Sequence, residues 1–80
     1  MEPVKICMTR GIAGAMSNDS NFPWGVHNAL ERFTSNDFGK ANPDENDDES
    51  KMGVYEISGR VVWVMWNYGE LITVLFPDEY

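Results

Sequence analysis

The fold class is decided by residues 54–76, which read VYEISGRVVWVMWNYGELITVLF. This stretch is rich in Val, Ile, Tyr, Trp and Thr, the residue types that favour β-strands. Ser58-Gly59 and Asn67–Glu70 supply turn residues between its apolar runs. The stretch therefore predicts an antiparallel meander with strands over residues 54–58, 60–66 and 71–76, ended by Pro77 and followed by a short acidic tail over 78–80.

The middle strand of this meander is apolar on both of its faces, because apolar side chains occupy both parities from residue 61 to residue 66. Alternate residues of a strand point to opposite faces, so Trp63 and Trp66 are expected on opposite faces and at most one belongs to the core. The other indole, together with Tyr68, is expected to form an exposed aromatic patch that anchors a protein interface. The alternative is that a helix or a homodimer partner covers that face.

The helical part of the chain precedes the meander. A helix is predicted from Phe22 or Pro23, because proline suits the first helical turn. Its apolar residues recur along one stripe, namely Phe22, Val26, Ala29, Leu30 and Phe33. Residues 10–16 are small and apolar and predict one or two helical turns, while residues 44–52 predict either a short polar helix or a loop.

Residues 4–9 alternate weakly between apolar and polar side chains and predict a short strand that pairs with an edge of the meander. Eighty residues suffice for one small domain. The predicted architecture is therefore a single α+β domain over residues 1–80, with one to three short helices packed on a three- or four-stranded antiparallel sheet.

The composition limits the partners that the chain can bind. It is 42% hydrophobic with a net charge of −7, which predicts a folded core and disfavours both nucleic acid and anionic membranes, since these are polyanions. A basic protein surface is the favoured partner, and simple solubility is the alternative reason for the charge. The chain has one cysteine, so no intramolecular disulfide can form. It has no charged N-terminal segment followed by a long apolar run, and its longest apolar run is residues 61–66. We therefore expect a cytoplasmic protein.

The most unusual local feature is the run Asp44-Glu-Asn-Asp-Asp-Glu49, in which five of six side chains are anionic. An unpaired buried carboxylate costs several kcal/mol, so this run is expected to face water, a metal ion or a basic partner. A calcium loop requires a glycine at its sixth position, and the run has none. From Asp37 to Lys51, six carboxylates oppose two lysines, a local charge of −4.

Carboxylates at such intervals can imitate the phosphates of a nucleic acid, and a solvated loop is the alternative interpretation. The residues predicted to bind a partner combine the anions with the aromatic patch: Asp37, Asp44, Glu45, Asp47, Asp48, Glu49, Trp66 and Tyr68.

The sequence predicts no catalytic, metal or cofactor site. His27 lies off the apolar stripe of its helix, with no Ser, Cys or second His at a motif spacing. Cys7 lies in a predicted strand, where a buried free thiol is the ordinary expectation. The sequence contains no Cys-x-x-Cys, no His-x-x-x-His and no phosphate-binding glycine loop. We therefore expect a protein that is not an enzyme.

Several motifs resemble a group of small proteins carried by bacterial plasmids, phages and integrated elements. They are Glu31-Arg32-Phe33, Asp37-Phe38-Gly39, the acidic stretch from Asn42 to Lys51, and the closing segment Ile72–Tyr80. The resemblance covers residues 9–80, and the closing segment is its most specific part. The chain departs from the group in its central strand, where WVMWNYGE replaces a more polar hairpin. The resemblance implies a mobile-element setting in a bacterial host and no particular mechanism.

Charge, composition and setting together predict a small acidic inhibitor of a host defence nuclease, of the anti-CRISPR or another anti-defence type, that occupies a basic groove. The alternative is a structural or regulatory homodimer with a solvated acidic segment and no inhibitory role.

Overall fold

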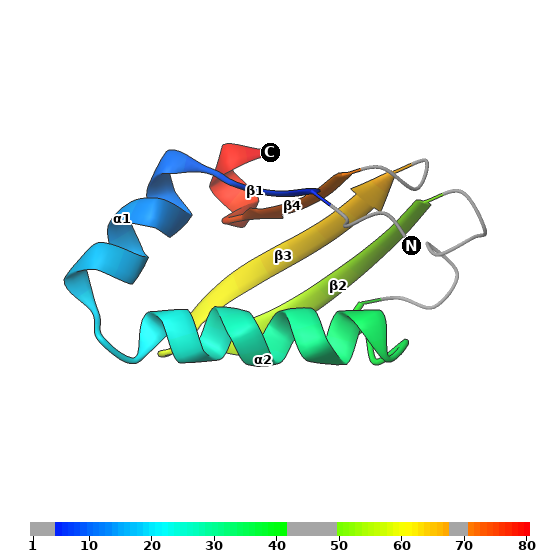
Figure 1. Cartoon of the computed structure of the whole chain (residues 1–80), viewed down its shortest axis with the longest axis horizontal. Helices are drawn as coiled ribbons and strands as arrows, with labels where there is room; N and C mark the ends of the chain where they lie inside the picture. Colours follow the sequence, from blue (N-terminus) through cyan, green and yellow to red (C-terminus); the bar gives the residue numbers. More distant parts are fainter. Residues whose placement is uncertain (1–4, 42–49, 68–70) are drawn as a thin grey trace.

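A computed structural model of the chain describes residues 5–41, 50–67 and 71–80. Strand β1 (Lys5–Met8) is followed by helices α1 (Arg10–Asn18) and α2 (Phe22–Thr34). Strands β2 (Ser50–Ile57), β3 (Arg60–Asn67) and β4 (Leu71–Leu75) come next, and a 3₁₀ turn, η2 (Pro77–Glu79), closes the chain (Figure 1). The predicted α+β class is confirmed.

The four strands form one sheet in the order β1-β4-β3-β2. The β2–β3 and β3–β4 pairs are antiparallel, as the meander predicts, whereas β1 runs parallel to β4. The prediction of a purely antiparallel sheet was therefore wrong in this detail. Parallel neighbours need a long crossover connection, and the two helices with β2 and β3 provide it.

Strand β2 begins earlier than the sequence indicated. Ser50 pairs with Asn67 and Lys51 with Trp66, so residues 50–52 extend the ladder instead of forming the polar helix or loop predicted for 44–52. The reason is cross-strand pairing with the apolar end of β3, which outweighs a weak local preference. Residues 44–49 lie outside the described residues.

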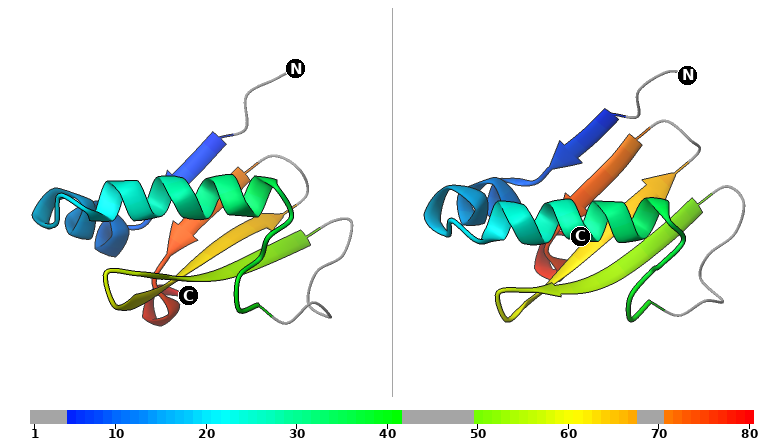
Figure 2. Two further views of the ribbon diagram at one scale, coloured as in Figure 1. Left: turned by 90° about the horizontal axis from the view of Figure 1, so that it is seen from below. Right: turned by 60° about the horizontal axis from the view of Figure 1, so that its bottom comes forward.

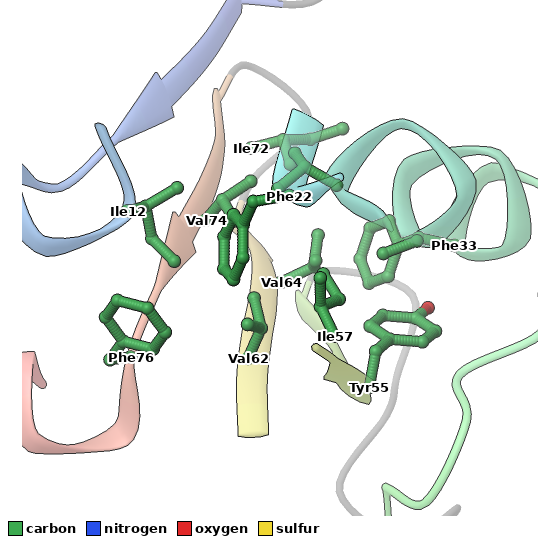
Figure 3. Close-up of a cluster of buried hydrophobic side chains, with 12 residues drawn as sticks. Ile12, Phe22, Phe33, Tyr55, Ile57, Val62, Val64, Ile72, Val74 and Phe76 are labelled. Atoms are coloured by element: carbon green, nitrogen blue, oxygen red, sulfur yellow. The ribbon is translucent and has the colours of Figure 1, made fainter. Parts of the chain in front are cut away.

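The core lies between the helices and one face of the sheet, with α2 running across that face (Figure 2). The predicted stripe of α2 is confirmed: Phe22, Val26, Ala29 and Phe33 are buried, and Leu30 is partly buried against them. Figure 3 shows how α1, α2 and the sheet meet in one cluster. Its members from outside α2 are Ile12, Tyr55, Ile57, Val62, Val64, Ile72, Val74 and Phe76.

The opposite face of the sheet, here called the open face, carries the alternate side chains of the same strands, which point away from the core. Both helices pack in the cluster on the first face, so the open face receives cover from neither. Its side chains include Val54, Val61, Trp63, Met65 and Leu71 by register. Trp63 is partly exposed, and Val61 and Leu71 are exposed. The prediction that Trp63 and Trp66 occupy opposite faces is confirmed, because Trp66 packs against the core.

The predicted acidic tail is instead a bonded turn. The Glu79 carboxylate accepts hydrogen bonds from the Thr9 hydroxyl (2.5 Å), the Gly11 amide (2.9 Å) and the Phe76 amide (3.0 Å). Thr9 is the N-cap of α1, so Glu79 places a negative charge where the helix dipole favours one. The closing segment thereby joins the start of α1 to the end of β4.

This bonding makes the stability dependent on pH. The Thr9 hydroxyl, followed by the Phe76 amide, holds the pKa of Glu79 below its usual range. A carboxyl group whose pKa is lowered by folding stabilises the fold at pH values above its unfolded-state pKa of roughly 4.3. This contribution is lost as the pH falls through the folded-state pKa. We expect the Glu79→Gln variant to have a lower free energy of unfolding than the wild type at pH 7. This difference, here called the stability gap, is expected to be smaller at pH 3.5.

Urea denaturation at both pH values measures this gap, with Asp78→Asn in the same turn as the matched control. A gap of equal size at pH 7 and pH 3.5 would contradict the role given to the Glu79 carboxylate.

Candidate functional site

Asp37, the first predicted binding residue, lies just after α2, and its carboxylate is bonded to other groups of the same chain. Its Oδ2 atom lies 2.9 Å from Nε of Arg32, and its Oδ1 atom accepts from Nη2 of Arg32 at 3.4 Å and from the Gly39 amide at 3.2 Å. The Arg32 hydrogen bond, and then the Gly39 amide, lower the pKa of Asp37. The same hydrogen bond raises the pKa of Arg32. Asp37 is thus already paired and contributes less uncompensated charge than its sequence position suggests.

Hydrogen bonds hold the segment that begins at Asp37 against the outer edge of β2. The buried Tyr55 donates its hydroxyl to the Asp37 carbonyl at 2.7 Å, and burial raises the pKa of Tyr55 to about 12. Val54 donates to the Phe38 carbonyl at 3.0 Å and accepts from the Lys40 amide at 2.9 Å. These bonds cover part of an edge that would otherwise present unpaired backbone groups.

The remaining predicted anions, from Asp44 to Glu49, and the aromatic Tyr68 lie outside the described residues. Their described flanks are adjacent. Ser50, which follows the acidic segment, pairs with Asn67, and Asn67 pairs with Leu71. Ser50, Asn67 and Leu71 therefore lie side by side at one end of the sheet.

Trp66 lies one residue further into the sheet, where it pairs with Lys51 and Ile72. It is partly buried against the core, so only part of its surface is available for the predicted partner contact. The part of its surface that remains lines a hollow of about 220 Å³. The other residues of this hollow are Phe33, Thr34, Asn36, Lys51 and Ile72.

Two basic side chains that precede the acidic segment in sequence are already engaged by other carboxylates. Arg32 binds Asp37 as described, and Nζ of Lys40 lies 3.6 Å from Glu56. Lys51, the first base after the segment, lies over the Phe38 ring at 5.8 Å. Arg32 and Lys40 are thus held by carboxylates outside Asp44–Glu49.

Other sequence expectations have clear outcomes. His27 is a surface residue, as predicted, with Nε2 3.0 Å from Glu31. Cys7 is exposed rather than buried, because β1 is a short edge strand whose odd residues lie on the open face. The sequence reasoning missed two exposed aromatic side chains, Tyr80, which is 82% exposed after η2, and Trp24, which is 68% exposed on α2. Its position two residues after Phe22 places it off the apolar stripe, and this signal was present in the sequence.

Within residues 5–41, 50–67 and 71–80, no group of three or more His, Cys, Asp or Glu side chains is arranged to hold a metal ion. Among the same residues, no helix has the length and apolar character needed to cross a bilayer. Comparison with protein-family models, curated proteins and solved structures finds no match to this chain.

Proposed function

We propose that this chain is a small acidic binding protein without catalytic activity, which inhibits a host defence nuclease by occupying its basic nucleic-acid groove. The proposed setting is a mobile element in the cytoplasm of a bacterial host. The observation that carries the proposal is the concentration of charge: five of the six residues Asp44–Glu49 are anionic, while Arg32 and Lys40 are engaged by other carboxylates.

The charge supports a basic partner through simple electrostatics. With a net charge of −7, the chain is attracted to cationic surfaces, and a groove that binds nucleic acid is such a surface. Favourable charge mainly accelerates the encounter between two proteins and makes their binding sensitive to salt.

The end of the sheet offers apolar area for the same contact. The acidic segment is followed directly by Ser50 and Lys51, and Lys51 pairs with Trp66 in the neighbouring strand. The hollow lined by Trp66, Phe33 and Ile72 is therefore close to the point where the acidic segment joins the sheet. Partly exposed aromatic side chains beside charge are common anchors of protein interfaces.

The alternative function is a structural or regulatory homodimer with a solvated acidic segment. It is favoured by one observation, the partly exposed Trp63 on the open face. The two candidates differ in whether the chain retains basic proteins and inhibits a nuclease.

The test is capture from a bacterial lysate at 50 mM NaCl on the immobilised chain, followed by elution with rising salt and mass spectrometry. We expect basic nucleic-acid-binding proteins that elute as salt screens the contact, among them a nuclease whose DNA cleavage the purified chain inhibits. Retention of no basic protein, or a retained nuclease that cleaves equally well with the chain present, would overturn the proposal.

A further inference from the structure

Most of the described side chains on the open face of β2, β3 and β4 are apolar. Its centre is Trp63 on β3, which pairs with Val54 on one side and with Leu75 on the other. Met65, Val61 and Leu71 extend this surface along the strands, with Val61 45% and Leu71 39% exposed. Large contiguous apolar patches on a soluble protein usually mark a binding surface.

Tyr80 adds a second aromatic ring to this surface. Its ring is edge-on to Trp63, with the centroids 5.8 Å apart, and Tyr80 is 82% exposed. The Trp63–Tyr80 pair therefore presents two aromatic rings on the open face, while Leu75 beside Trp63 is buried where η2 follows β4. Aromatic side chains contribute most of the affinity in many interfaces.

We propose that the open face is the interface of a homodimer, in which the sheets of two copies of this chain pack face to face. Two identical faces related by a two-fold axis must be complementary to themselves. Sheets that pack in this way bury their inner faces about 10 Å apart, with the strands either nearly aligned or crossed.

The distribution of charge favours a second copy over a basic partner on this face. Among the described strand residues, the open face carries one cation, Lys5, and one carboxylate, Glu56. By register, Lys5 lies level with Asn67 at the β1 edge, whereas Glu56 lies at the opposite end on the β2 edge. Two copies whose strands cross about a two-fold axis perpendicular to the line from Lys5 to Glu56 place Lys5 near Glu56 of the partner subunit. A strongly basic partner would find a single carboxylate there, already 3.6 Å from Lys40.

The area is sufficient for a reversible dimer. Four strands of four to eight residues give the face a projected area on the order of 400 Å². Two such faces, with their protruding side chains, bury roughly 1,000 Å² of accessible surface, which is the lower end for specific interfaces. We therefore expect dissociation in the micromolar range, where a chain of this size also gains stability from association.

Analytical ultracentrifugation of the full chain from 1 to 200 µM tests the proposal. The wild type is expected to dimerise, and Val61→Lys with Leu71→Lys is expected to weaken the dimer at least 100-fold. Both side chains are exposed, so the lysines leave the helix-covered core intact. The double variant lowers the net negative charge from −7 to −5, so greater long-range repulsion cannot explain a loss of dimer.

The matched control is Trp24→Lys with His27→Lys, which makes the same charge change on the exposed surface of α2. This variant is expected to dimerise like the wild type, and circular dichroism checks that both variants keep the fold. A wild type that stays monomeric at 200 µM overturns the proposal. A dimer that survives the lysines at 61 and 71, or one that the α2 variant disrupts equally, also overturns it. None of these outcomes depends on whether the chain inhibits a nuclease.

Discussion

Replacing Gly39 with alanine is expected to lower the free energy of unfolding by about 3 kcal/mol. Gly39 has φ +63°, a conformation that costs an L-residue roughly 1–2 kcal/mol. A Cβ atom at this position would also overlap the carbonyl oxygen of Val54. Because this oxygen belongs to the backbone of β2, the overlap can be relieved only if segment 38–40 moves away from β2.

The parting of these segments would weaken the two hydrogen bonds that Val54 makes with Phe38 and Lys40, each worth about 1 kcal/mol. The matched control is Gly59→Ala. Gly59 also has a positive φ, +78°, but a Cβ atom there meets nothing within 4 Å. We expect this control to cost about 1 kcal/mol, the conformational part alone.

Urea denaturation of the two variants at pH 7 separates the two contributions. A loss at Gly39 clearly greater than the loss at Gly59 supports the close contact between segment 38–40 and β2. Equal losses would show that the contact is not tight and that Asp37 and Phe38 are not fixed by it.

The parts of the fold that local patterns specify were predictable from the sequence. The stripe from Phe22 to Phe33 predicted α2, and the alternation through residues 61–66 placed the two indoles of β3 on opposite faces. These predictions succeed because helix and strand periods determine which side chains can share a face. Trp24 was equally predictable, since it lies off the same stripe.

The parts that depend on distant pairing were not predictable. Nothing near Lys5–Met8 indicates whether this strand runs parallel or antiparallel to β4, because that depends on how the helices return the chain to the sheet. Glu79 binds Thr9, which lies 70 residues earlier, so the C-terminal residues resembled an ordinary acidic tail. Asp37 resembles an available anion in the sequence, because the sequence does not show that the side chain of Arg32, five residues earlier, lies beside it.

Neutralising part of the acidic segment is expected to have the largest effect on binding. The variant Asp47→Asn, Asp48→Asn, Glu49→Gln removes three carboxylates and changes the net charge from −7 to −4. An exposed ion pair contributes about 0.2–1 kcal/mol, so we expect a loss of about 2 kcal/mol, roughly a 30-fold weaker affinity. This loss should shrink in high salt, since the Debye length falls from about 10 Å at 0.1 M to about 3 Å at 1 M.

A second triple variant separates the local charge from the net charge. Glu2→Gln, Glu31→Gln and Asp78→Asn remove the same number of carboxylates from positions outside the acidic segment. If only the net charge mattered, this variant would bind as weakly as the first. We expect it instead to stay within about threefold of the wild type, because these side chains are not part of the proposed contact.

The most direct measurement is the dissociation constant of the captured nuclease for the wild type and the two triple variants, determined by titration calorimetry at 50 and 500 mM NaCl. The proposed contact predicts a weaker complex only for the variant at Asp47, Asp48 and Glu49, with the difference largely removed at 500 mM. Equal affinities for all three proteins at 50 mM, or equal losses for both variants, would contradict the claim that this acidic segment binds a cationic groove.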